Sequence, residues 1–214
     1  MRRAMVEYQL RARGISDERV LEVMAEIPRE KFIAQARRDE AYEDRPVPIG
    51  SGQTISQPYI VALMSQELSV GPDHRVLDVG AGSGYQTAIL ARLGREVFAI
   101  ERIEELADRA GAVLAELGID NVTLMTGDGT LGWAEEAPFD RIICGAAGPD
   151  VPEAWIEQLA EGGRIVMPVG GPDVQNLIAI DKKGGKITRR HICGVRFVRL
   201  IGQQGWNENE YELT

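Results

Sequence analysis

Cysteine and histidine are scarce in this sequence, which has two of each among its 214 residues. Cys144 and Cys193 both lie in apolar runs that are typical of strands, so we expect both thiols to be buried and reduced. A metal site would need further ligands, and neither His74 nor His191 has metal-ligand spacing to a cysteine. We therefore predict no metal site.

The sequence also lacks long apolar runs and an excess of positive charge. No apolar stretch approaches the ~18–20 residues that a membrane helix needs, and no signal-peptide core follows the first residues. We therefore expect a cytoplasmic protein with no membrane partner. Lys and Arg total 24 against 33 Asp and Glu, and the net charge of −9 disfavours a nucleic-acid-binding surface. We expect a monomer with no nucleic-acid partner.

The composition that is present, 44% apolar and 27% charged, is typical of one globular domain of this length. Residues 1–58 are predicted to be a mostly helical extension that ends in a loop. Apolar spacing predicts a helix over residues 17–27, with Ser16 as its N-cap, and a second helix over residues 59–68. The prolines and glycines of residues 45–53 predict a constrained, irregular loop.

Residues 75–170 alternate strand-like and helix-like segments, which predicts βαβ units and a parallel sheet. The strands are expected at residues 75–79, 96–100, 122–125, 139–144 and 164–169, and the helices at 87–93, 104–117 and 152–159. Residues 171–202 hold strand-like segments at 174–180 and 192–201 around a glycine turn, which predicts an antiparallel edge. Residues 206–214 are expected to be a loose tail.

These patterns together predict a single α/β domain. The expected fold is Rossmann-like and doubly wound, with a mostly parallel sheet, an antiparallel C-terminal edge and an N-terminal helical extension. Residues 75–170 are its expected cofactor-binding core.

A glycine loop follows the first expected strand, in the sequence Asp78-Val79-Gly80-Ala81-Gly82-Ser83-Gly84. Glycines allow a tight turn and the close approach of a ligand to the backbone, and the N-terminus of the next helix favours a negative group. Because the loop stands between a buried strand and a helix, we predict that it binds a cofactor and is not a plain turn.

Glu101 stands at the end of the second expected strand, 21 residues after Gly80. An acidic residue about 20 residues past such a loop commonly accepts hydrogen bonds from ribose hydroxyls. The alternative is an acid that stabilises the start of the following helix. The position and the strand context both favour the ribose role.

The spacing of the glycines separates two kinds of cofactor. A dinucleotide fingerprint has two residues between its second and third glycines, whereas only Ser83 separates Gly82 from Gly84. Asp78 precedes the loop, where its carboxylate would repel a pyrophosphate but would suit a cationic amino-acid headgroup. These features favour S-adenosylmethionine and disfavour an NAD-dependent oxidoreductase.

Asp128 and Gly129 follow the third expected strand, within Thr126-Gly127-Asp128-Gly129. At this position the carboxylate could accept a hydrogen bond from the exocyclic amine of adenine. The alternative, which the motif by itself favours, is an Asp-Gly turn without a ligand.

The segment Pro48-Ile49-Gly50-Ser51-Gly52-Gln53-Thr54-Ile55-Ser56-Gln57-Pro58 is the most informative about the family. Together with the glycine loop and residues 127–129, 134–140, 145–147 and 162–170, it resembles the protein-L-isoaspartate O-methyltransferase family over residues 5–202. Residues 53–58 are the most specific part of this resemblance, because general methyltransferases lack them.

The resemblance implies methyl transfer from S-adenosylmethionine to the free carboxylate of L-isoaspartyl residues in damaged proteins, whose methyl ester then closes to a succinimide. It also implies that Ser56 is the active-site serine, which orients the substrate carboxylate. Without the resemblance, Ser56 would be interpreted as an N-cap of the next helix. The glycine loop and the family pattern together give these expected cofactor contacts: Gln53, Thr54, Ile55, Ser56, Val61, Asp78, Gly80, Gly82, Ser83, Glu101, Asp128 and Gly129.

One position departs from the family pattern, because Arg199 stands where the family often has proline. Its side chain could attract an acidic peptide or cover an exposed edge strand. Two other hypotheses are a methyltransferase for a small molecule or RNA, and a non-catalytic cofactor-binding protein. Residues 53–58 and the net charge disfavour the first, whereas the glycine loop, Glu101 and Ser56 disfavour the second.

Overall fold

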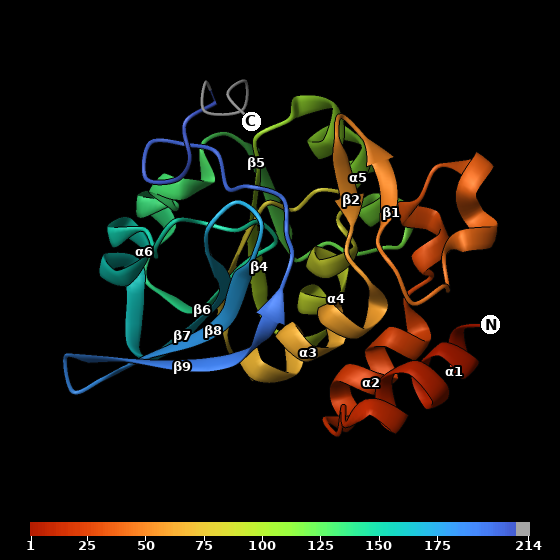
Figure 1. The fold of residues 1–214 in the computed structure, drawn as a ribbon, viewed down its shortest axis with the longest axis horizontal. Helices are drawn as coiled ribbons and strands as arrows, with labels where there is room; N and C mark the ends of the chain where they lie inside the picture. The colour runs from red at the N-terminus through yellow and green to blue at the C-terminus, as the bar shows by residue number, and fades with distance from the viewer. Residues whose placement is uncertain (209–214) are drawn as a thin grey trace.

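The computed structural model describes residues 1–208 and is built on a seven-stranded sheet in the order β5-β4-β3-β6-β7-β8-β9 (Figure 1). Neighbouring strands from β5 to β7 are parallel, and the pairs β7-β8 and β8-β9 are antiparallel. This topology confirms the predicted fold class. The strands are β3 (Arg75–Val79), β4 (Glu96–Glu101), β5 (Val122–Thr126), β6 (Phe139–Cys144), β7 (Leu159–Gly170), β8 (Gln175–Lys183) and β9 (Lys186–Val195).

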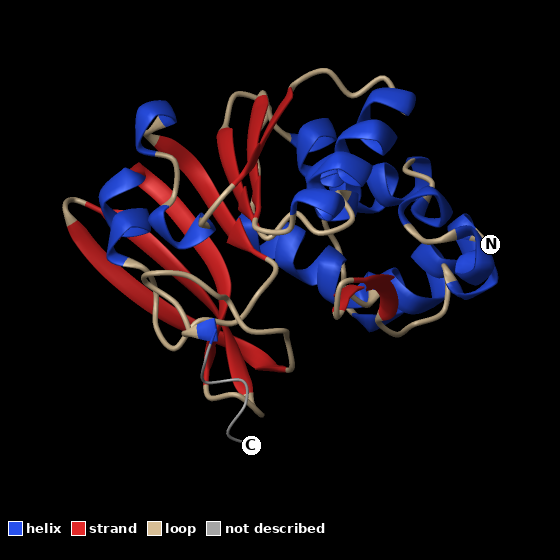
Figure 2. Ribbon diagram, turned by 90° about the horizontal axis from the view of Figure 1, so that it is seen from above, coloured by secondary structure: helices blue, strands red, loops and turns tan. Residues whose placement is uncertain are grey.

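Helices lie on both faces of the sheet, and the larger group is on the side that carries the N-terminus (Figure 2). Along β3, Val76 packs into the cluster of that larger group, whereas Leu77 packs into a second cluster with Trp155. This alternation places buried side chains on both faces of a central strand. The helices that follow the extension are α3 (Pro58–Leu68), α4 (Tyr85–Leu93), α5 (Glu104–Glu116) and α6 (Glu153–Gln158), with short 3-10 turns η5 (Gly129–Leu131) and η6 (Ala134–Glu136).

The N-terminal extension is helical, as expected, and lies at the end of the molecule away from β9 (Figure 1). The expected N-cap is wrong by one residue, because the carboxylate of Asp17 accepts hydrogen bonds from the amides of Arg19 and Val20. The Ser16 amide donates instead to Gln66 Oε1 at 2.7 Å. The extension comprises α1 (Arg2–Ala4), η1 (Met5–Leu10), η2 (Arg11–Arg13), α2 (Glu18–Glu26), η3 (Arg29–Phe32) and η4 (Gln35–Glu40).

The prediction of an irregular loop over residues 45–53 is wrong. β1 (Val47–Gly50) and β2 (Gln53–Ile55) form a two-stranded antiparallel hairpin in which Pro48 pairs with Thr54. Proline is tolerated there because one side of each strand in a two-stranded ribbon needs no ladder hydrogen bonds. The turn of the hairpin uses left-handed φ angles of 51° at Ser51 and 70° at Gly52.

Two strand boundaries near the C-terminus also differ from the predictions. The second strand of the last hairpin covers residues 186–195 instead of 192–201, because the Gly184-Gly185 turn lets pairing begin at once between Lys183 and Lys186. β7 begins at Leu159, earlier than expected, where it pairs with Phe139 of β6. Residues 196–201 follow the edge strand β9 and run back to the segment after β6, where Arg199 forms a β-bridge with Ala147.

The start of the C-terminal tail is bound to the domain, contrary to the expected loose tail. The Trp206 indole nitrogen donates to the Ala147 carbonyl at 3.0 Å, and the Trp206 amide donates to the Leu200 carbonyl at 2.8 Å. Residues 209–214 of the expected tail lie outside the described residues. Among residues 1–208, no helix is both long and apolar enough to cross a bilayer.

Candidate active site

The strand order reverses between β3 and β6. From β3 the chain runs outward through β4 to β5, and it then returns to place β6 on the other side of β3. Ligands of such sheets bind beyond the carboxyl ends of the strands at this reversal. The two strands are followed by Gly80 and Gly145, and a Cβ on Gly145 would lie 3.0 Å from the Gly80 carbonyl oxygen. Both glycines line a hollow at this point.

The glycine loop adopts backbone conformations that favour glycine. Gly80, Gly82 and Gly84 have φ angles of 77°, 56° and 84°, in the left-handed region where a Cβ is disfavoured. Gly84 is also the N-cap residue of α4. At Gly80 and Gly82 the loop therefore presents bare backbone to the hollow, which is what the close approach of a ligand requires.

Glu101 ends β4 beside this loop and is only 6% exposed. Its Oε2 accepts from the Gly82 amide at 2.8 Å, and its Oε1 accepts from the Ile103 amide at 2.9 Å. The carboxylate thus holds both the glycine loop and the start of α5, so the alternative helix-start role is present. Each carboxylate oxygen can accept a second hydrogen bond. Because Glu101 lines the hollow, its contact with ribose hydroxyls stays a prediction that the geometry allows.

Asp78 lies deeper, at 1% exposure, and accepts a hydrogen bond of 2.6 Å from the Thr87 hydroxyl. Burial raises the pKa of Asp78 to about 7, with a smaller contribution from the nearby charge of Glu101, while the Thr87 hydrogen bond opposes the rise. A buried carboxylate with one neutral partner is stabilised by an approaching cation. Asp78 therefore suits the cationic headgroup predicted for this place.

Asp128 is the one predicted cofactor residue that does not line the hollows around the reversal point. Its Oδ1 accepts from the amide and the hydroxyl of Thr130 at 2.9 and 2.6 Å, and its Oδ2 accepts from the Gln203 amide at 2.8 Å. These bonds are those of a turn-forming aspartate, and the adenine contact stays a prediction. Gly129 does line the hollow, and a Cβ there would lie 2.5 Å from Val79 Cγ1.

Three connected hollows surround the reversal point. The main cleft has a volume of about 520 Å³, the inner pocket about 50 Å³ and the outer groove about 490 Å³. Thr54 of the hairpin and Gly145 after β6 line all three, so the hollows meet between these residues. The main cleft reaches Gln53, Glu101 and Gly129, and the inner pocket is lined by Ile55, Ser56, Val61, Asp78 and Ser83 among others.

Ser56 stands where the inner pocket opens into the outer groove, and it lines both. Its side chain is half-buried. Its carbonyl oxygen accepts a hydrogen bond of 2.8 Å from Arg29 Nη2, whereas no hydrogen bond within residues 1–208 engages its hydroxyl. The hydroxyl is therefore available to donate to a ligand in the groove.

The far wall of the main cleft is formed by Val198, Arg199, Leu200 and Ile201; the sequence marked Arg199 as a departure from the family pattern but did not show what this segment packs against. The Ala147 amide donates to the Val198 carbonyl at 2.7 Å, and the Leu200 amide donates to the Ala147 carbonyl at 2.9 Å. Arg199 stands beyond the end of β9 and lies over the Trp206 ring at 5.7 Å, so it does not cover the edge strand. The apolar pattern of residues 195–201 signalled a strand but not its partner.

An ion pair adds to this wall near the end of the described chain. Arg102 Nη1 lies 2.8 Å from Glu208 Oε1, and both residues line the main cleft. No sequence motif marked this pair, because the two residues are far apart in the chain and neither belongs to a recognisable pattern. The tail thus contributes one side of the cleft.

The residues fit S-adenosylmethionine. The volume of the main cleft lies within the range of about 300–1,000 Å³ that is typical of small-ligand sites. The Glu101 carboxylate can accept further hydrogen bonds from hydroxyl groups. Asp78 is a buried acid without a charged partner among the described residues. Within residues 1–208, no group of three or more His, Cys, Asp or Glu side chains is arranged to hold a metal ion. Cys144 is buried and Cys193 partly buried, and both are free thiols.

The sequence matches known proteins over almost its whole length. The profile of the family described as protein-L-isoaspartate(D-aspartate) O-methyltransferase matches residues 1–205. The Protein-L-isoaspartate O-methyltransferase of Methanoculleus marisnigri is 50% identical over 205 residues, which are 96% of this chain and 93% of that protein. Protein-L-isoaspartate O-methyltransferase 2 of Geotalea uraniireducens is 52% identical over 207 residues, covering 96% of this chain and 95% of that protein.

Solved structures agree with the sequence matches. A protein-L-isoaspartate O-methyltransferase structure is similar with a TM-score of 0.87 at 30% identity, covering 96% of this chain and 67% of the other. A Plasmodium falciparum protein described as such a methyltransferase, in complex with S-adenosyl-L-homocysteine, has a TM-score of 0.81 at 31% identity and covers 94% of this chain and 98% of its own. The chain therefore belongs to the protein-L-isoaspartate(D-aspartate) O-methyltransferase family.

Proposed function

We infer that this chain is an S-adenosylmethionine-dependent protein-L-isoaspartate O-methyltransferase, which methylates the free carboxylate of L-isoaspartyl residues in damaged proteins and peptides. The observation that carries the proposal is the position of Ser56, at the opening between the inner pocket and the outer groove. This position fits a reaction in which a carboxylate in the groove meets a methyl donor held in the cleft. Relatives at about 50% identity carry the name of this activity.

The glycine loop, Glu101 and the hairpin would hold the cofactor in the main cleft and the inner pocket. When bound, S-adenosylmethionine supplies a methyl group on a cationic sulfur. Gly80 and Gly82 leave the backbone bare for close approach, and Glu101 accepts from hydroxyl groups of the ligand. Asp78 offers its carboxylate to the cationic headgroup. Gln53, Thr54, Ile55 and Val61 close the pocket around the ligand.

The reaction needs no general base. A carboxylate with a pKa of ~4 is already ionised at neutral pH, so no proton has to be removed before it attacks. Neither His74 nor His191 lines the three hollows, which is compatible with such a reaction. The protein contributes mainly by holding the reacting groups in line.

We propose that the Ser56 hydroxyl orients the substrate carboxylate by donating a hydrogen bond to one of its oxygens. This bond leaves the other oxygen free to accept the methyl group. The hydroxyl is not required as a nucleophile, because no side chain of residues 1–208 accepts a hydrogen bond from it as an activating base would. In this family, the methyl ester then closes to a succinimide that hydrolyses partly to normal aspartate.

The proposal is tested by transfer of a radiolabelled methyl group from S-adenosylmethionine to an isoaspartyl peptide and to its aspartyl twin. We expect labelling of the isoaspartyl peptide alone. Equal labelling of both peptides, or of neither, would overturn the substrate assignment.

We also propose that a monomer is the active unit, because a single chain by itself brings Ser56, Asp78 and Glu101 together around the hollows. Light scattering during gel filtration, combined with activity across the peak, tests this. A cytoplasmic location stays a prediction.

A further inference from the structure

Arg29, at the start of η3, has a fully buried side chain with 0% exposure. It forms no ion pair within residues 1–208. Burial accordingly lowers the pKa of its guanidinium to about 10. A buried charge without a counter-ion reduces stability, and an apolar residue would fill the same space at less cost. Packing alone therefore does not explain an arginine at this position.

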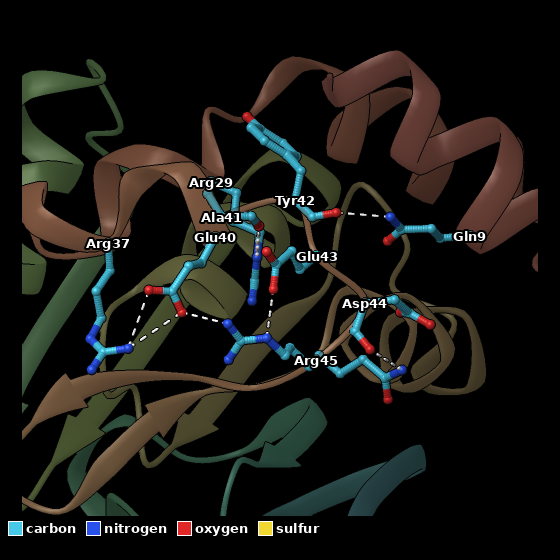
Figure 3. A network of polar contacts seen from close by, with 10 residues as sticks. Gln9, Arg29, Arg37, Glu40, Ala41, Tyr42, Glu43, Asp44 and Arg45 are labelled. Carbon is cyan, nitrogen blue, oxygen red and sulfur yellow. Dashed lines mark hydrogen bonds and ion pairs between the residues drawn. The ribbon is translucent and has the colours of Figure 1, made fainter.

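The guanidinium binds two backbone carbonyls from different segments. Its Nε donates to the Ala41 carbonyl at 2.8 Å, a bond visible in Figure 3, and its Nη2 donates to the Ser56 carbonyl at 2.8 Å. It also lies over the Tyr85 ring, at 4.9 Å from the centroid. Arg29 thus contacts three parts of the chain that are far apart in the sequence.

Two of these three contacts, Ser56 and Tyr85, border the inner pocket. Ser56 belongs to the wall between the inner pocket and the outer groove, and Tyr85 begins α4 directly after the glycine loop and lines the inner pocket. Ala41 belongs to the helical extension. A second hydrogen bond also joins this segment to the extension, since Gln57 Nε2 donates to the Asp44 carbonyl at 3.0 Å. The extension therefore holds the peptide that follows the serine at two points.

We propose that Arg29 is a positioning residue for methyl transfer, whose guanidinium fixes the Ser56 peptide group, and with it the direction of the Ser56 hydroxyl, relative to the glycine loop. The proposal rests on the role of Ser56 in the proposed function. Methyl transfer depends on the alignment of acceptor oxygen and donor, so a small rotation of Ser56 reduces turnover even when the cofactor binds normally.

A guanidinium suits this role better than other donors. Its planar, rigid fork reaches two carbonyls at once and stacks on an aromatic ring, whereas the lysine ammonium is a compact point charge on a flexible stem. Hydrogen bonds from a charged donor are also shorter and stronger than those from a neutral one. Arg29→Lys should therefore keep the charge but lose the fixed geometry.

The test compares Arg29→Met, Arg29→Lys, Ser56→Ala and the double variant Arg29→Met with Ser56→Ala. The readouts are kcat with an isoaspartyl peptide and Kd for S-adenosylhomocysteine by calorimetry. We expect Arg29→Met to lower kcat by about 10- to 100-fold and to change Kd by less than about threefold, because alignment and not cofactor binding is lost. In the Ser56→Ala background, the same change should lower kcat by less than about threefold, because the two residues act together.

Arg19→Met is a matched control. Arg19 also donates to two backbone carbonyls, those of Val70 at 2.7 Å and Leu93 at 2.6 Å, but it lines none of the three hollows. We expect this variant to lose thermal stability and to keep kcat within about twofold, since it removes two such bonds away from the site.

The proposal would be overturned by an unchanged kcat in Arg29→Met, or by a fall in cofactor affinity as large as the fall in kcat. It would also be overturned if the fold-reduction of kcat in the double variant equalled the product of the two single-variant reductions. If Arg29→Met does not fold, Arg29→Lys is used in its place. A fall in kcat with a nearly unchanged Kd then supports the proposal, and an unchanged kcat overturns it. Failure of the proposed function is distinct, because the unaltered enzyme would then not label the isoaspartyl peptide. Failure of the Ser56 role alone would show as an unchanged kcat in Ser56→Ala.

Discussion

At the residue scale, Asp78 and Glu101 show how two buried acids at neighbouring strand ends acquire different properties. Glu101 accepts hydrogen bonds from two backbone amides, those of Gly82 and Ile103. Asp78 accepts one hydrogen bond, from the Thr87 hydroxyl. Amide donors stabilise a carboxylate, and a single neutral hydroxyl leaves a fully buried one under-stabilised. Glu101 therefore shapes the site, while Asp78 is a candidate to respond to the charge of a ligand.

We expect Glu101→Ala to weaken S-adenosylhomocysteine binding by about tenfold or more, because one residue anchors the glycine loop and accepts from hydroxyls of the ligand. Calorimetry measures the change in Kd. Glu104→Ala, which alters an exposed acid in the first turn of α5, is the control and should bind normally. Equal affinity of the two variants would refute the cofactor role of Glu101.

The affinity for S-adenosylmethionine should depend on pH through Asp78. Burial raises its pKa from an ordinary value of 3.8 to about 7, so the folded protein holds a proton that the unfolded chain releases near pH 4. The resulting contribution to stability is present below about pH 4 and is lost as pH rises through about 7. A cationic ligand favours the ionised form, so binding should tighten by about tenfold between about pH 6 and pH 8.

Calorimetry in buffers of different ionisation enthalpy tests this dependence, because binding near pH 7 should release a proton. Asp78→Asn should remove both the proton release and the pH dependence. A pH dependence that persists unchanged in Asp78→Asn would assign it to another group.

Ser56→Ala should lower kcat by about 10- to 100-fold and leave Kd for S-adenosylhomocysteine nearly unchanged, because the proposed role of the hydroxyl is to orient the substrate carboxylate, while alanine keeps the backbone that lines the cofactor pocket. Ser56→Thr keeps a hydroxyl and should retain more activity than the alanine variant. Steady-state kinetics with an isoaspartyl peptide supply the comparison. Unchanged kinetics in Ser56→Ala would contradict the assigned role.

At the element scale, the β1–β2 hairpin and the loops after β3 and β5 form the site by close approach of backbone segments. The hairpin brings Thr54 to the point where the three hollows meet. After β5, Gly129 approaches Val79 so closely that its missing side chain is a structural requirement. Sequence patterns mark such turns but do not state which other segment lies against them.

Gly129→Ala should lower the free energy of unfolding by about 1–3 kcal/mol and weaken cofactor binding, because the new Cβ would lie 2.5 Å from Val79 Cγ1. Gly127→Ala is the matched control in the same loop, where a Cβ would lie an ordinary 3.7 Å from Met125 Cε. Urea titration and calorimetry measure the two effects. Equal stability of the two variants would show that the β3 strand end yields to the added methyl group.

At the scale of the whole molecule, charge is unevenly placed. The chain carries a net charge of −9, yet Arg196 is the one charged side chain that lines the outer groove within residues 1–208. Arg196 is exposed at the rim, next to Phe197. A single positive charge in the groove of an acidic protein favours a substrate segment with a nearby negative charge, since complementary charges set specificity and encounter rate.

Arg196→Glu should lower kcat/KM by about 3- to 10-fold for isoaspartyl peptides with acidic flanking residues, and should raise it for peptides with basic ones, as expected for one exposed pair. Lys186→Glu makes the same charge change at the start of β9, outside the groove, and is the control. Added salt should reduce both effects. Equal changes of kcat/KM in the two variants would mean that the overall charge of the protein causes the effect, and not Arg196 in the groove.

The fold class could be predicted from the sequence because it depends on local patterns. Alternating strand and helix segments specify a parallel sheet, and β3, β4 and β6 lie within one residue of their expected bounds. The exceptions are instructive. Residues 47–55 form a hairpin where an irregular loop was expected, and β9 is displaced toward its turn, because pairing with a neighbouring strand decides both.

The sequence by itself determined the glycine loop, Glu101 and the family-specific segment, because each is a contiguous motif whose chemistry depends on residue type and spacing. Only the tertiary structure decided what surrounds them. It placed residues 198–201 as a wall of the cleft, engaged Asp128 in turn-forming hydrogen bonds, and brought the Arg29 guanidinium to the Ser56 carbonyl. The physical reason is that these contacts join residues far apart in the chain. Their partners are set by how the strands and the helical extension pack together, which no local pattern encodes.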